Sequence, residues 1–163
     1  MKKMIAEVKK RLSAKRFCHS KAVAETAEKL AKYWGVNPEK AYLAGLLHDI
    51  GKELSLEEMI QIIPQGTILN SEEKSIDLLH SLASTIIAQR DFKIFDEEIL
   101  QAIKCHTVGG KESGPLAQIL YLADYIAPGR KQPGVEEVRK IANIDLEQAL
   151  LMVYNQTLTY LNE

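Results

Sequence analysis

The sequence places an imidazole beside a carboxylate at His48 and Asp49, just after the apolar pair Leu46-Leu47 and shortly before Lys52. A buried carboxylate is costly unless it is paired or coordinates a metal. Histidine beside aspartate supplies the mixed nitrogen and oxygen ligands that divalent transition metals accept. A His-Asp dipeptide alone is unspecific, so its interpretation depends on which other side chains the fold brings to it.

The other histidines and one more aspartate fall on apolar faces or at the ends of expected helices. These residues are His19, His80, His106 and Asp124. Taken singly, each has an ordinary explanation as a hydrogen-bonded residue of the core. Four histidines and two carboxylates in such positions together favour one shared metal centre, because facing helices of a bundle often build metal sites from inward-pointing carboxylates and imidazoles.

Apolar residues recur at helical spacing along most of the chain, and no run alternates with the period of a strand. Asn37, Ser55 and Asp96 have the residue types and contexts that begin helices. The expected helices cover about 5–14, 20–34, 38–48, 56–63, 75–89, 97–106, 115–126, 135–141 and 145–161, with His19 opening the second and one extended loop at 64–71. The sequence therefore predicts an all-α fold in a single domain over residues 1–163.

Composition and apolar patterning bear on the expected partners and location of the protein. Lysine and arginine number 21 against 22 aspartates and glutamates, so a general nucleic-acid-binding surface is not expected. The first residues lack the apolar core of a signal peptide, and no later run is long enough to span a membrane. The two cysteines, Cys18 and Cys105, are expected as reduced thiols, which places the protein in the cytoplasm.

Four motifs carry a resemblance to a known family. They are Arg16-Phe17-Cys18-His19-Ser20, His48-Asp49-Ile50-Gly51-Lys52-Glu53, His106-Thr107-Val108-Gly109 and Leu122-Ala123-Asp124-Tyr125-Ile126-Ala127-Pro128-Gly129-Arg130. In this order they resemble the bacterial YqeK branch of the HD-domain phosphohydrolases. The resemblance implies a helical bundle of the HD superfamily, with an HD core at about 16–142 and a C-terminal packing helix at about 145–161.

The resemblance also implies an activity, the symmetrical hydrolysis of diadenosine tetraphosphate to two ADP. Its metal ligands map onto His19, His48, Asp49 and Asp124, and it implies iron, with manganese and zinc as alternatives. A metal-bound water loses its proton near neutral pH and provides the hydroxide that attacks the phosphoanhydride. Asp49, Lys52 and His80 are the expected catalytic residues, and the expected substrate contacts are Lys52, Glu53, His80, His106, Thr107 and Arg130.

Several alternatives stay open at this point. His80 and His106 either bind phosphate, with one of them giving a proton to the departing ADP, or ligate a second metal. The substrate is either the dinucleotide or that of another HD phosphohydrolase, such as a nucleoside monophosphatase or a guanosine tetraphosphate hydrolase. A third reading is a non-catalytic nucleotide sensor, and pairing into a homodimer through an apolar helix face is also open.

Overall fold

The computed structural model describes residues 1–64, 67, 76–109 and 113–161, and within these ranges it contains nine helices and no strand. The helices are α1 (Lys2–Arg11), α2 (Ala14–Trp34), α3 (Pro38–Leu47), α4 (Leu56–Ile62), α5 (Ile76–Phe92), α6 (Glu97–Cys105), α7 (Pro115–Ile126), α8 (Val135–Ile141) and α9 (Leu146–Leu161). The all-α prediction is confirmed. Most of the loop expected at 64–71 lies outside the described residues.

Three helices begin at the capping residues that the sequence predicts. The Asn37 side chain accepts hydrogen bonds from the backbone N–H groups of residues 39 and 40 at the start of α3. Ser55 and Glu58 form a reciprocal capping box at the start of α4. The Asp96 side chain accepts hydrogen bonds from the backbone N–H groups of residues 98 and 99 at the start of α6. Each cap satisfies backbone donors that have no partner inside the first turn of a helix.

The start of α2 differs from the expectation. The helix begins at Ala14, with the Ser13 side chain accepting a hydrogen bond from the N–H of Arg16, so the prediction that His19 opens this helix is wrong. No proline or glycine lies between Ser13 and His19 to stop the helix, and His19 therefore lies in its second turn. The imidazole consequently projects from the side of a rigid helix rather than from a flexible end.

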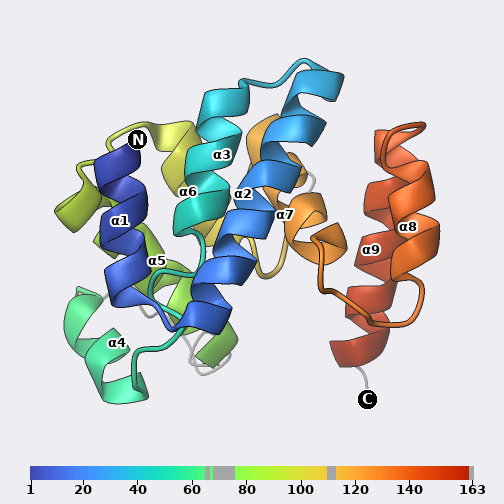
Figure 1. Ribbon diagram of the computed structural model, residues 1–163. Helices are drawn as coiled ribbons and strands as arrows, with labels where there is room; N and C mark the ends of the chain where they lie inside the picture. Colours follow the sequence, from blue (N-terminus) through green and yellow to red (C-terminus); the bar gives the residue numbers. More distant parts are fainter. Residues whose placement is uncertain (65–66, 68–75, 110–112, 162–163) are drawn as a thin grey trace.

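Helix α3 lies against part of the longer α2, with α7 beside both (Figure 1). The two backbones approach closely where Gly45 of α3 meets Ala24 of α2. A Cβ atom added to Gly45 would lie 2.6 Å from the Ala24 Cα atom, which is closer than real side chains allow. This close approach brings His48, the residue that ends α3, to the same level as the first turns of α2.

Helices α8 and α9 pack together and against α7 on one side of the molecule (Figure 1). Ala149, Leu150 and Val153 of α9 are buried. The Trp34 indole N–H donates to the carbonyl of Ala142 over 2.9 Å, which ties the end of α2 to the end of α8. In this arrangement α7 is covered on both flanks.

We expect Gly45→Ala to lower the free energy of unfolding by about 1–3 kcal/mol, because the added methyl group forces α2 and α3 apart. The better helix propensity of alanine returns only about 1 kcal/mol. Chemical denaturation measures the difference. As a control, Lys29→Ala on the exposed face of α2 should change stability by less than about 0.5 kcal/mol. A more stable Gly45→Ala protein would contradict this account of the helix contact.

Candidate metal centre

Six side chains from five parts of the chain converge at the C-terminal ends of α3 and α6. They are His19 of α2, His48 at the C-cap of α3 with Asp49 after it, His80 of α5, His106 at the C-cap of α6, and Asp124 of α7. His48, Asp49, His80 and His106 are buried. The structure thus brings together all the residues that the sequence singled out for a metal centre.

The first cluster contains two imidazole nitrogens and two carboxylate oxygens. His19 Nε2 lies 3.1 Å from Asp124 Oδ1, and His48 Nε2 lies 3.4 Å from Asp49 Oδ2. The His48 Nδ1 atom lies 2.7 Å from the carbonyl of Gly45, to which it donates, so the neutral imidazole of His48 presents the lone pair of Nε2 to the cluster. Both Nε2 atoms are buried, and neither has a hydrogen-bond partner within the described residues. Buried nitrogens without partners beside two carboxylates fit a divalent transition metal.

The electrostatics of this cluster require a positive charge. Burial disfavours charge on His48, but the carboxylates of Asp49 and Asp124 outweigh it and raise the pKa of His48 to about 9. Burial opposes ionisation of Asp124, yet His19 and His48 hold the pKa of its carboxyl well below the usual range. Both carboxylates are therefore anionic. Arg16 pairs with Asp49 and Arg130 with Asp124, and a metal ion or a proton on His48 would add positive charge between the two carboxylates.

The second cluster uses the other oxygen of Asp49. Asp49 Oδ1 lies 3.3 Å from His80 Nε2 and 3.5 Å from His106 Nε2, and the two Nε2 atoms are 3.0 Å apart. On the far side of His80, Lys52 Nζ lies 3.1 Å from Nδ1. His106 Nδ1 donates to the carbonyl of Ile103 over 2.7 Å. His80 Nδ1 also lies 3.3 Å from the carbonyl of Ile76. In the tautomer in which Nδ1 accepts from the Lys52 ammonium group, His80 carries its proton on Nε2 and donates toward His106.

Two arginines complete the charge pattern. Arg16 Nη1 lies 2.7 Å from Asp49 Oδ2, and its buried Nε atom has no partner within the part of the chain that the structure describes. Arg130 donates to the Asp124 carboxylate and, through Nε, to the Asp124 carbonyl over 2.9 Å. Arg130 was expected from the sequence, whereas Arg16 was missed as a site residue. The available signal was its position three residues before His19, almost one helical turn away.

Two expected substrate contacts lie at the edge of this site. The carboxylate of Glu53 accepts from the backbone N–H of Ser13 over 2.7 Å and also from the Ser13 hydroxyl, so it holds the start of α2. Thr107 follows His106, and its buried hydroxyl has no hydrogen-bond partner among the described residues.

A second residue that sequence reasoning missed is Ser84 of α5. Its buried hydroxyl accepts a hydrogen bond from the N–H of Gly51 over 3.0 Å. That bond fixes the turn which runs from Asp49 to Lys52. No sequence pattern marks Ser84, because its partner lies 33 positions away along the chain.

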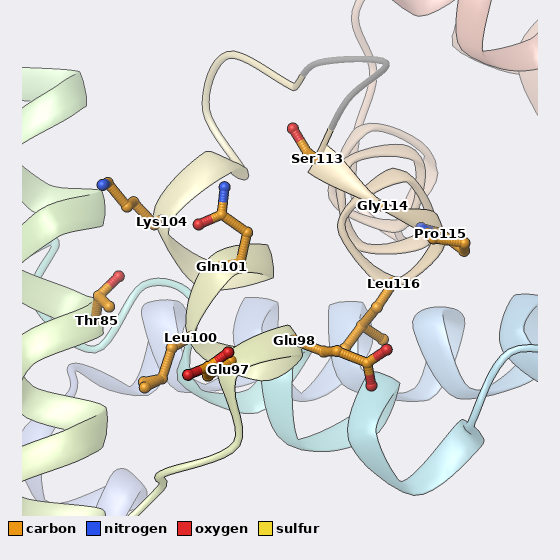
Figure 2. A pocket seen from close by; sticks show the side chains of 10 residues that line it. All are labelled: Thr85, Glu97, Glu98, Leu100, Gln101, Lys104, Ser113, Gly114, Pro115 and Leu116. Atoms are coloured by element: carbon orange, nitrogen blue, oxygen red, sulfur yellow. The ribbon is translucent and has the colours of Figure 1, made fainter.

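A hollow of about 500 Å³ lies between α6 and the start of α7, and Figure 2 shows its lining. Gln101 and Lys104 of this lining belong to the exposed face of α6, whereas Ile99, Ala102 and Ile103 face the core. His106 extends the inner face, so this hollow lies on the opposite side of α6 from the histidines.

Comparison with known proteins agrees with this geometry. The HD-domain family matches residues 16–129, a range that contains every side chain of both clusters. This chain belongs to the HD-domain family. HD domains depend on a bound metal, and the His/Asp clusters are where this HD protein has the donors for one.

The relatives of this HD protein include named enzymes. It is 38% identical over 158 residues to the symmetrical bis(5'-nucleosyl)-tetraphosphatase of Bacillus subtilis. The aligned region covers 96% of this chain and 85% of that enzyme. It is 37% identical to the enzyme of the same name from Staphylococcus aureus, with an alignment that covers 94% of this chain and 89% of that enzyme. A crystal structure from Clostridium acetobutylicum, described as a predicted HD superfamily hydrolase involved in NAD metabolism, superposes with a TM-score of 0.92 and 41% identity over 98% of this chain and 85% of that one.

Two further expectations concern membrane-spanning helices and the cysteines. Among the helices of the described residues, none has both the length and the apolar character that crossing a bilayer requires. Cys18 and Cys105 are both free.

We expect Ser84→Ala to reduce metal affinity about tenfold, because the turn after Asp49 loses its anchor and a buried N–H loses its partner. Metal titration of the purified variant measures this. Ser81→Ala is the matched control, since the buried Ser81 hydroxyl bonds only within its own helix, to the carbonyl of Leu78. Equal metal affinities for the two variants would show that Ser84 does not position the cluster.

Proposed function

We propose that this HD-domain protein hydrolyses diadenosine tetraphosphate symmetrically and releases two ADP. The observation that carries the proposal is the similarity to symmetrical bis(5'-nucleosyl)-tetraphosphatases over at least 94% of this chain. The clusters around Asp49 supply the buried histidines and carboxylates that such a metal-dependent reaction needs.

We propose iron as the metal, held by His19, His48, Asp49 and Asp124. Two imidazole nitrogens and two carboxylate oxygens also suit manganese and zinc, so iron is chosen on the family resemblance. When bound, the metal supplies an acidified water and a positive charge beside the attacked phosphoryl group. The protein's part is to fix the tautomer of His48 through Gly45 and to keep both carboxylates ionised.

His80 is proposed as the residue that gives a proton to the departing ADP. In the tautomer in which Nδ1 accepts from Lys52, the proton of His80 is on Nε2, the nitrogen that faces His106 and Asp49. In this role His80 and His106 contact phosphate oxygens rather than a second metal. Lys52, Arg16 and Arg130 supply positive charge for the four phosphates, as cations do in phosphoryl transfer generally. Glu53 and Thr107 stay proposed contacts at the edge of the substrate.

Other HD phosphohydrolase specificities share this site chemistry, and the products distinguish them. A nucleotide sensor is a weaker alternative, because it needs neither an activated water nor a proton donor. A homodimer, a cytoplasmic location and the division into a core at about 16–142 and a packing helix at about 145–161 stay predictions.

The protein purified without chelator should contain metal and convert diadenosine tetraphosphate to ADP alone. Chromatography of the products, with metal analysis of the same sample, measures both. Prolonged treatment with a chelator should abolish activity, because it removes the metal that the histidines and aspartates of the clusters are proposed to hold. Added iron should restore the activity. ATP with AMP as products, or full activity of metal-free protein, would contradict the proposal.

His80→Ala should lower turnover by about 10²–10⁴-fold while the metal content per chain stays the same, since the variant loses a proton donor but no ligand of the first cluster. Thr85→Ala is the control on the same helix, because its hydroxyl bonds only to the carbonyl of Ser81. Loss of one equivalent of metal from His80→Ala, with Thr85→Ala unchanged, would instead assign His80 and His106 to a second metal.

A further inference from the structure

We propose that Glu53 and Ser13 are positioning residues, whose contact fixes the first turns of α2 at the metal centre. Glu53 lies on the turn that follows His48 and Asp49, and Ser13 is the N-cap of α2. His19 projects from the second turn of the same helix. The inference deepens the proposed function, because it concerns how the chain holds the donors of the metal on which that function depends.

The start of α2 lacks an acceptor that a serine-capped helix often carries in its own first turn. In a capping box, the third residue of the helix returns a glutamate or glutamine side chain to the backbone N–H of the N-cap. Ser55 and Glu58 form such a box at the start of α4. At α2 the third position holds Arg16, whose guanidinium can only donate. An acceptor for the N–H of Ser13 therefore has to come from solvent or from elsewhere in the chain.

Glu53 supplies this acceptor from 40 positions away along the sequence. Its carboxylate accepts from the backbone N–H of Ser13 over 2.7 Å and also from the Ser13 hydroxyl. The Ser13 hydroxyl oxygen in turn accepts from the N–H of Arg16 over 3.2 Å. The two hydrogen bonds from Ser13 lower the pKa of the Glu53 carboxyl, and an anion is favourable at the N-terminus of a helix. Glu53 thus completes the cap of α2 in place of a residue of that helix.

Arg16, at the position of the missing glutamate, contacts the metal centre instead. Its Nη1 atom lies 2.7 Å from Asp49 Oδ2. Asp49 and Glu53 belong to one turn, and Ser13 and Arg16 to one end of α2, so two separate contacts join these segments (Figure 1). Two contacts oppose rotation of the helix end as well as its displacement. Because His19 follows Arg16 by less than one helical turn, the same contacts determine where its imidazole lies.

The packing of α2 on α3 does not provide this restraint by itself. The close approach of the two helices is at Gly45 and Ala24, and α3 ends at Leu47. The ring of His48, directly after α3, lies 5.4 Å from the ring of His19. The part of α2 that precedes His19 therefore extends beyond the end of α3. Its polar contacts there are with the turn that carries Asp49 and Glu53.

Ser13→Ala and Glu53→Ala should each weaken the binding of Fe²⁺ by about fivefold, somewhat less than the loss of a group that bonds directly to a metal ligand. The double variant should bind no more weakly than either single variant, because both changes remove the same contact. Competitive titration of Fe²⁺ against a chelator, with metal-stripped protein under anaerobic conditions, measures these affinities. Ser13→Thr, which keeps a hydroxyl at the N-cap, should bind Fe²⁺ as the unaltered protein does.

Ser55→Ala is the matched control, because it removes an N-cap of the same kind at α4. It should lower the unfolding temperature about as Ser13→Ala does and leave the Fe²⁺ affinity unchanged. An equal loss of affinity in Ser55→Ala would overturn the positioning role, since it would indicate a general effect of stability. A loss in Glu53→Ala without one in Ser13→Ala would also overturn it, because charge alone would then explain the result.

The positioning role and the proposed function can fail separately. If Ser13→Ala and Glu53→Ala lose Fe²⁺ affinity as expected but the unaltered protein does not cleave diadenosine tetraphosphate, the positioning role stands and the proposed function fails. Cleavage by the unaltered protein, with unchanged Fe²⁺ affinity in both variants, gives the opposite result.

Discussion

The buried carboxylate of Asp49 is the interaction on which the rest of this structure depends. One oxygen faces His48 and Arg16, and the other faces His80 and His106. A lone anion in this interior would be prohibitively costly, so the cationic and imidazole groups around it are a condition of folding as well as of chemistry. Helices α2, α3, α5 and α6 each deliver one of these groups, and the candidate metal centre is built from the same side chains.

Much of this arrangement could be predicted from the sequence, because local physics determines it. Asn37, Ser55 and Asp96 cap their helices through bonds to residues two or three positions away, so a short window contains the whole signal. The order of histidines and aspartates along the chain likewise carried the family resemblance that the match over residues 16–129 confirms.

The features that the sequence did not reveal depend on contacts between distant segments. Ser84 matters because Gly51 lies across from it, and nothing in the neighbourhood of either residue indicates the other. Arg16 was overlooked because helix α2 was expected to start later, which left this side chain outside any element.

Two residues of the centre occupy the C-caps of helices, His48 after α3 and His106 after α6. The carbonyl end of a helix carries a partial negative charge of about half an elementary unit, from its aligned peptide dipoles. Two such ends converge here, so the backbone itself attracts a cation and repels a polyphosphate. The lysine and arginines at the rim then have an additional purpose, which is to reverse the sign of the field that an approaching nucleotide meets.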